Sequence, residues 1–284
     1  MAALDPGPGD PDLRPYHGHG ISLRPEHYAG ALRHLPSVSW VEVISERFLD
    51  VRGGLRLEVL DRVRGERPLA LHGTSLSIGS VDPLDESYLA RLRALVDRVQ
   101  PVWVSDHLAW SSLDGRELEL LPLPYTEECL QHVIRRVAAV QDRLGATPLL
   151  LENPASYLEF SASTMPEWEF LAAVARASGC GILLDVNNLS VSASNHGFDP
   201  ADYLSGLPAD RVWEIHLAGH RRSGALVIDT HEGPVPEGVW TLYVDAVRHF
   251  GAVSTIVEWD TGVPPLEVLV AQSSRAAALE GRAP

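Results

Sequence analysis

Eight short apolar runs, separated by longer amphipathic stretches, constrain the fold of this chain more than any other feature. Each run is rich in aliphatic and β-branched residues and ends at Pro, Gly or polar turn residues, which is typical of buried strands. The expected strands are residues 20–24, 40–45, 68–73, 101–107, 148–154, 181–188, 211–219 and 254–260. Near-continuous apolar strands of this kind indicate a parallel sheet that is covered on both faces.

Amphipathic patterns between these runs predict the covering helices. Apolar residues recur there at three- and four-residue spacing, as on one face of an α-helix. The expected helices are residues 89–99, 127–144, 167–178, 239–250 and 266–279. This alternation within 284 residues favours an α/β fold, a single (β/α)8 TIM barrel. An open doubly wound sheet is the alternative, but no GxGxxG turn follows the first strand.

The N-terminal segment and the net charge narrow the class of protein. Residues 1–17 are polar and rich in Pro and Gly, so we expect a flexible leader before a catalytic barrel domain at 18–284. The segment lacks the apolar core of a secretory signal, and no apolar run is long enough to span a bilayer. We therefore expect a cytoplasmic protein without membrane contact. The formal net charge of −15 argues against nucleic-acid binding, because it would repel phosphate backbones.

Metal-capable side chains stand at or just after the end of seven of the eight expected strands, at the carboxyl end where a TIM barrel carries its active site. They are Glu46, His72, Asp106, His107, Glu152, Asn153, Asp185, Asn187, Asn188, His216, His220, Glu258 and Asp260. In the loop VIDTHEG, Asp229 and His231 are two residues apart and would point the same way in an extended segment. Burying so many charges without partners would cost several kcal/mol each, so bound metal ions are expected.

The donor types narrow the choice of metal. Imidazole and carboxylate without thiolate favour Fe, Mn, Zn or Co. The donors exceed the roughly four to six that one ion needs, so two or three ions are expected. Taken singly, His72 and His107 could be core histidines, and Glu152 could be a salt-bridge partner. The pair at 229–231 and His196 could likewise be surface-loop positions.

Long motifs resemble those of the multinuclear non-heme iron-dependent oxidase family, which includes the iron subunit of methanobactin biosynthesis. The motifs are HGTSLSIGS (72–80), VSDHLAW (104–110), LLPLPYTEECL (120–130), LLENPASYLEF (150–160), LLDVNNLSVSASNHGFDP (183–200), EIHLAGH (214–220), IDTHEGPV (228–235) and TIVEWD (255–260). They occur in order over about residues 18–275. The resemblance implies a xylose-isomerase-like TIM barrel with two or three irons in its mouth, Fe(II) and Fe(III) together, and O2 as co-substrate.

The resemblance also implies roles for individual residues. By motif, the metal ligands are His72, His107, Glu152, Asp185, Asn188, His216, Asp229, His231 and Glu258. Glu152 is the expected bridging ligand, whereas Asp229, His220 and Asp260 are the expected proton-handling residues. His196 and Glu46 are expected near the site. The implied substrate is a precursor peptide, often modified at a cysteine and presented by a small peptide-recognition partner protein.

One departure from the family pattern follows the second strand. The family commonly has Ser-Glu-Asn there, whereas this chain has Ser45, Glu46 and Arg47. Arg47 is either outside the site or a contact for a substrate carboxylate. Two other functions remain open from the residues alone. The same set of ligands would serve a metal-dependent hydrolase or isomerase, and a metal-storage or scaffold protein would need no chemistry.

Overall fold

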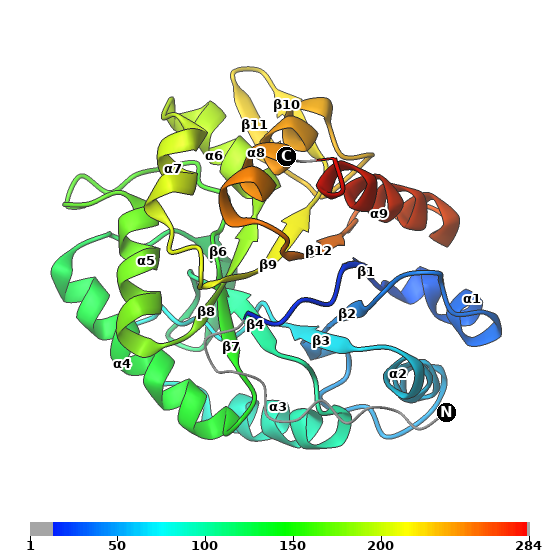
Figure 1. Ribbon diagram of the computed structural model, residues 1–284. Coiled ribbons are helices and arrows are strands. Elements are labelled where there is room, and N and C mark those ends of the chain that lie inside the picture. Colours follow the sequence, from blue (N-terminus) through cyan, green and yellow to red (C-terminus); the bar gives the residue numbers. More distant parts are fainter. Residues whose placement is uncertain (1–13, 283–284) are drawn as a thin grey trace.

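The computed structural model describes residues 14–282 and contains a closed barrel of eight parallel strands (Figure 1). The strands are β1 (His19–Ser22), β2 (Val41–Ile44), β3 (Leu69–His72), β4 (Val104–His107), β7 (Leu149–Glu152), β8 (Gly181–Asp185), β9 (Val212–Leu217) and β12 (Ser254–Val257). Their order around the barrel is β1, β12, β9, β8, β7, β4, β3, β2. Every expected strand is present, and the predicted (β/α)8 TIM barrel is confirmed.

Helices surround the barrel (Figure 1). They are α1 (Tyr28–Arg33), α2 (Leu55–Glu66), α3 (Glu86–Val99), α4 (Glu127–Leu144), α5 (Glu167–Ser178), α6 (Val186–His196), α7 (Pro200–Gly206), α8 (Glu237–Phe250) and α9 (Leu266–Glu280), with 3-10 turns η1 (Pro25–His27) and η2 (Ser45–Arg47). The amphipathic patterns predicted α3, α4, α5, α8 and α9. They missed α1 and α7, which are short, and α2, whose sequence is LRLEVLDRVRGE. They also missed α6, whose sequence VNNLSVSASNH is largely polar.

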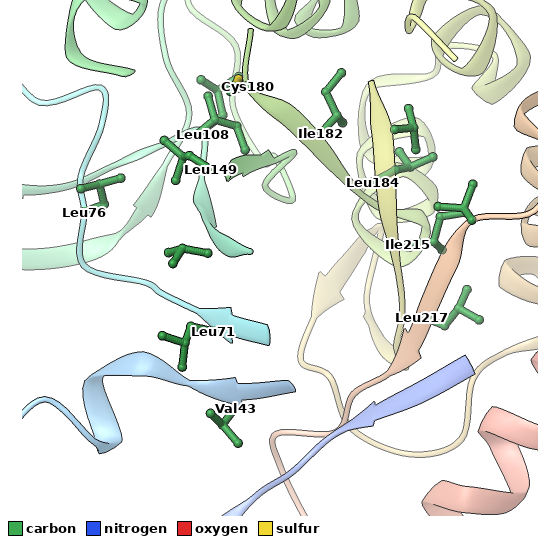
Figure 2. Close-up of a cluster of buried hydrophobic side chains, with 14 of the residues drawn as sticks. Val43, Leu71, Leu76, Leu108, Leu149, Cys180, Ile182, Leu184, Ile215 and Leu217 are labelled. Atoms are coloured by element: carbon green, nitrogen blue, oxygen red, sulfur yellow. The ribbon is translucent and has the colours of Figure 1, made fainter. Parts of the chain in front are cut away.

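The two-residue repeat of the strands separates two sets of apolar side chains. Outward side chains such as Val43, Leu71 and Ile215 belong to the large core between barrel and helices (Figure 2). A smaller set, here called the inner cluster, consists of Trp40, Ala70, Trp103, Leu150, Leu183 and Ile256. Its members alternate with the outward residues, so they fill the barrel interior.

Two local expectations are corrected. The strand expected at 181–188 ends at Asp185, because the Asp185 carboxylate caps α6 by accepting a hydrogen bond from the backbone N–H of Asn188. The segment 108–128 contains the hairpin β5 (Trp110–Leu113) and β6 (Arg116–Leu121). The backbone is not extended at His231, whose φ of 45° is left-handed. A second hairpin, β10 (His220–Ser223) and β11 (Leu226–Asp229), precedes that turn.

The last four residues of the expected leader contact the amino-terminal end of the barrel. The Arg14 guanidinium donates hydrogen bonds to the carbonyl oxygens of Val212, Phe250 and Ala252, at 3.1, 2.7 and 2.7 Å. The rest of that leader, residues 1–13, lies outside the described residues. Within residues 14–282, no helix combines the length and the apolar character needed to cross a membrane.

Candidate metal centre

Strand periodicity brings the expected ligands to one rim of the barrel. His72, Glu152 and Asp185 each stand two residues after a member of the inner cluster, so their side chains point into the same interior. Parallel pairing sets them at similar heights, because His107 pairs with Glu152 and Asp185 pairs with His216 in the sheet. All of these side chains are buried.

The first group of candidate ligands consists of His72, His107 and Glu152. The Nε2 atoms of the two histidines lie 3.4 and 3.3 Å from Glu152 Oε2. His107 Nδ1 lies 3.2 Å from the carbonyl oxygen of Gly73, which can only accept, so the hydrogen of the neutral ring is on Nδ1. Burial lowers the pKa of His107 to about 4 and holds that of His72 well below its ordinary value.

This geometry fits a bound cation. The bare Nε2 lone pair of a neutral His107 faces a carboxylate oxygen, so two acceptors oppose each other across a buried gap. Glu152 Oε2 has no hydrogen-bond partner among residues 14–282. A metal ion between these atoms would satisfy both, with the Nδ1 contact fixing the ring as in many protein metal sites.

The second group of candidate ligands surrounds His231. Its Nε2 lies 3.6 Å from Asp185 Oδ2 and 2.8 Å from Asp229 Oδ1, and its Nδ1 lies 2.9 Å from Glu258 Oε1. His216 Nδ1 lies 3.2 Å from the same Glu258 oxygen. Burial opposes the charge of Glu258, but His231 and His216 together hold its pKa well below the ordinary value.

The groups share ligands. Each of four sets has ligand atoms within 4.8 Å of one another: His72, His107 and Glu152; Glu152, Asp185 and His216; Asp185, His231 and Glu258; Glu42, His216 and Glu258. Glu152, Asp185 and Glu258 each occur in two sets. Carboxylates shared in this way can bridge metal ions, so the rim can hold more than one ion.

Asn188 contacts this rim from the first turn of α6. Its amide nitrogen donates to Glu152 Oε1 at 3.2 Å and to the carbonyl oxygen of Asn153 at 3.1 Å. Its Oδ1 is buried and has no partner among the described residues. Asn188 therefore both orients Glu152 and has an oxygen free to bind a metal.

The expected proton-handling residues form a chain beside the ligand sets. His220 Nδ1 lies 2.7 Å from Asn187 Oδ1, and the Asn187 amide donates to Asp229 Oδ1 at 2.8 Å. Asp260 lies on the other side of His231, with Oδ2 3.2 Å from His231 Nδ1. His220 and Asp260 belong to none of the four sets found among the described residues.

The expected near-site residues belong to none of the four ligand sets found among the described residues. His196 Nε2 contacts the carbonyl oxygen and hydroxyl of Ser156 at 3.1 and 3.0 Å. Glu46 Oε1 accepts hydrogen bonds from the amides of Thr74 and Ser75 and from the Tyr88 hydroxyl. Arg47 is exposed in η2.

Sequence reasoning missed three buried charged residues below and beside the rim. Glu42 in β2 and Glu214 in β9 are fully buried, and their Oε2 and Oε1 atoms lie 3.4 and 3.3 Å from His216 Nε2. Arg24, directly after β1, donates to Glu258 at 3.1 Å and to Asp260 at 2.7 Å. The sequence does contain one sign of the two glutamates, because each is the single acid within an apolar run, WVEVI or VWEIHL.

We expect the metal-free protein to lose stability as the pH rises from about 6.5 to about 9. Burial raises the pKa of Glu214 to about 8 and that of Asp185 to about 7. In this window the folded protein binds more protons than the unfolded chain, so the free energy of unfolding decreases with pH. Histidines whose pKa is lowered in the folded protein, such as His107, affect the pH dependence of stability only below about pH 6.5, the ordinary pKa of histidine.

Thermal unfolding of chelator-treated protein across this pH range measures the effect. Glu214→Gln removes one of the contributing acids, so its Tm should depend less on pH than that of the wild type. A wild-type Tm that rises with pH would contradict the assignment of these acids as protonated in the metal-free fold.

Comparison with known sequences gives matches along nearly the whole chain. The sequence model described as "RiPP precursor modification enzyme MbnB/TglH/ChrH" matches residues 18–280. A UPF0276 protein of Anaeromyxobacter sp. (strain Fw109-5) is 57% identical over 267 residues, covering 94% of each chain. A UPF0276 protein of Caulobacter vibrioides (strain NA1000 / CB15N) is 51% identical over 262 residues, covering 92% of this chain and 93% of that protein.

Solved structures of similar fold are xylose-isomerase-like barrels. D-psicose 3-epimerase has a TM-score of 0.61 at 11% identity, covering 94% of this chain and 99% of that chain. A xylose isomerase-like TIM barrel protein from Mycobacterium smegmatis, in complex with magnesium, has a TM-score of 0.53 at 14% identity, covering 82% and 80%. At these identities the likeness concerns the fold, and it confirms the expected kind of barrel.

Proposed function

Because the chain belongs to the family of RiPP precursor modification enzymes MbnB/TglH/ChrH, we propose that it is an iron-dependent oxidase acting on a precursor peptide. It would use O2 to modify one residue of a ribosomally made peptide, with cysteine as the expected residue. Family membership supports the peptide substrate. The shared carboxylates of the rim, which could join two or three ions, are the observation that supports a multinuclear iron centre.

The donor set suits iron in two oxidation states. Imidazole and carboxylate ligands accommodate both Fe(II) and Fe(III), and neither cysteine belongs to a ligand set among the described residues. When bound, iron would supply one-electron redox chemistry and open positions for O2 and for a substrate thiolate. His72, His107 and Glu152 would hold one ion. Glu152 would bridge it to a second ion, bound with Asp185 and His216.

The remaining ligands complete the proposed centre. Asp185, His231 and Glu258 would hold a further ion, to which Asp229 is adjacent through its contact with His231. Asn188 would contribute its free Oδ1. Such a buried rim excludes bulk water and holds the ligands in fixed orientations, which are the contributions of the protein to chemistry carried by a metal.

Protons would move along the chain of polar groups beside the centre. Asp229 is half-buried and lies between His231 and the Asn187 amide, which in turn contacts His220. Asp260 has a side chain that is 47% exposed, so it can exchange protons with solvent while it contacts His231. Asp229, His220 and Asp260 are therefore the proposed proton-handling residues.

A groove beside the rim has the size and lining for a peptide segment. Its volume is about 680 Å³, and its walls include Tyr125, Phe160, Trp168 and Tyr203. It is also lined by the loop after β7 and by α6, the elements that follow Glu152 and Asp185. Apolar walls with a few polar groups are typical of ligand-binding grooves. A small partner protein would present the peptide to this surface.

A single-metal isomerase or hydrolase is the second candidate. The observation in its favour is that Glu152, Asp185 and His216 form a set that could hold one divalent ion, on a barrel of the kind seen in sugar epimerases. That chemistry would not need O2. The His72 and His107 pair is then unexplained, because these residues add a further set of ligands to the one that a single ion requires.

The test is a peptide-modification assay. The chain is purified without oxygen, loaded with Fe(II), and combined with candidate precursor peptides that contain cysteine and candidate partner proteins chosen from the genes near its own. The expected result is a mass change in the peptide by mass spectrometry that requires both iron and O2. Modification without O2, or by chelator-treated protein, would contradict the oxidase. Turnover of a sugar by the zinc or manganese form would favour the second candidate.

A further inference from the structure

The barrel interior beneath the metal centre is acidic, which is unusual. TIM-barrel interiors are filled mainly by bulky aliphatic side chains. Here Glu42 and Glu214 point inward, one repeat below the rim, and neither has any exposed surface. Burying two carboxyl groups in an otherwise apolar layer is costly unless they bind specific partners. Their nearest ionisable partner is His216.

The two ring nitrogens of His216 face different surroundings. Nδ1 faces the metal centre, 3.2 Å from Glu258 Oε1. Nε2 faces the acidic layer one repeat below the rim, 3.3 Å from Glu214 Oε1 and 3.4 Å from Glu42 Oε2. A hydrogen on Nε2 satisfies the contact with these acceptors, and it leaves Nδ1 as the bare donor toward the metal.

Glu214 is itself held by an indole from the inner cluster. Trp103 Nε1 donates a hydrogen bond to Glu214 Oε2 at 2.7 Å, and Trp103 is fully buried. Indole N–H can only donate, so it fixes which oxygen of Glu214 remains for His216. Trp40 packs on Trp103 with ring centroids 5.5 Å apart, but its own Nε1 donates to the carbonyl oxygen of Gly18.

We propose that Trp103 and Glu214 are positioning residues that fix the tautomer and orientation of His216, so that its Nδ1 is presented to a metal ion. The inference rests on the proposed function in that His216 is a ligand. Outer partners of ligating histidines typically change metal affinity about 10- to 100-fold when removed. Trp103 acts on His216 only through its hydrogen bond to Glu214. Removing its indole should therefore weaken metal binding by an amount near the lower end of that range.

Two aromatic substitutions separate positioning from packing. Trp103→Phe and Trp40→Phe each remove one buried indole from the same cluster, but only the first removes a hydrogen bond to Glu214. Affinities for Fe(II) and for Zn(II) are measured anaerobically by competition with a chelator, and circular dichroism confirms that both variants fold. We expect Trp103→Phe to weaken metal binding about 10-fold and Trp40→Phe to leave it unchanged.

A third substitution tests the direction of the hydrogen bonds. In Glu214→Gln, the amide has one acceptor oxygen for two donors, His216 Nε2–H and Trp103 Nε1–H. Metal binding should therefore weaken by about 10- to 100-fold. In the double variant Trp103→Phe/Glu214→Gln, the amide oxygen is free for His216, so affinity should recover relative to Glu214→Gln alone. A purely structural role predicts further loss instead.

The outcomes keep this inference separate from the proposed function. Equal losses in Trp103→Phe and Trp40→Phe, or no loss in Trp103→Phe, would overturn the positioning role. Wild-type protein that binds Zn(II) but not iron would contradict the proposed oxidase. The zinc affinities of the variants would then still show whether Trp103 and Glu214 position His216. Wild-type protein that binds neither ion would overturn both.

Discussion

Glu152→Gln is expected to abolish peptide modification and to reduce the number of bound metal ions by more than one. Glu152 belongs to two ligand sets and contacts His72, His107 and Asn188. The amide has one acceptor oxygen and no charge, so it cannot bridge two cations. We expect activity to fall more than about 100-fold, beyond the usual loss from removing an outer partner of a ligand.

Elemental analysis and the peptide assay on the same samples measure this effect. Glu169→Gln, which removes an exposed acid on α5, is the matched control and should retain both iron and activity. A Glu152→Gln variant that loses activity but keeps its full metal content would show that Glu152 acts on the substrate and is not a bridge.

His107→Ala should release fewer metal ions than Glu152→Gln but should reduce activity as strongly. His107 occurs in one ligand set only, so its loss should release one ion and leave the ions bound through Asp185 and Glu258. Activity should be lost, because the remaining ions lack the partner needed for O2 chemistry at the multinuclear centre.

His132→Ala is the control for this substitution. His132 lies on α4, where its Nε2 contacts the carbonyl oxygen of Ser80, away from the ligand sets. Its removal should change neither iron content nor activity. Normal iron loading in His107→Ala would remove His107 from the ligand set and leave the pair with His72 without a metal-binding role.

The periodicity of strands explains why most of the rim could be predicted from sequence. Positions two residues apart share a face, and parallel strands end at the same edge. His72 after Ala70, Glu152 after Leu150 and Asp185 after Leu183 therefore had to converge once the strands were identified correctly. The expectation of a metal site came from the metal-capable side chains at seven strand ends, and the structure places several of these side chains within 4.8 Å of one another.

Other parts of the site could not be predicted, because they form through contacts that do not follow from strand periodicity. The turn after β11 places His231 beside Asp229 and Asp185 through a left-handed backbone conformation, which alternation could not reveal. An acid inside an apolar run, such as Glu42 or Glu214, does not show whether it faces the barrel interior or the helices until the register is known. The position of His196 at the end of a helix was not predicted either, because the strand expected at 181–188 includes the first residues of α6.

Iron content and oxidation state show directly whether the rim holds a multinuclear iron centre. The chain is expressed with added iron, purified without oxygen, and examined by elemental analysis and Mössbauer spectroscopy on one sample. Two or three irons per chain, about the number that shared carboxylates can bridge, with ferrous and ferric signals together, is the predicted result. A single zinc or manganese ion, with no iron bound, would contradict the proposed iron-dependent oxidase and favour the isomerase or hydrolase.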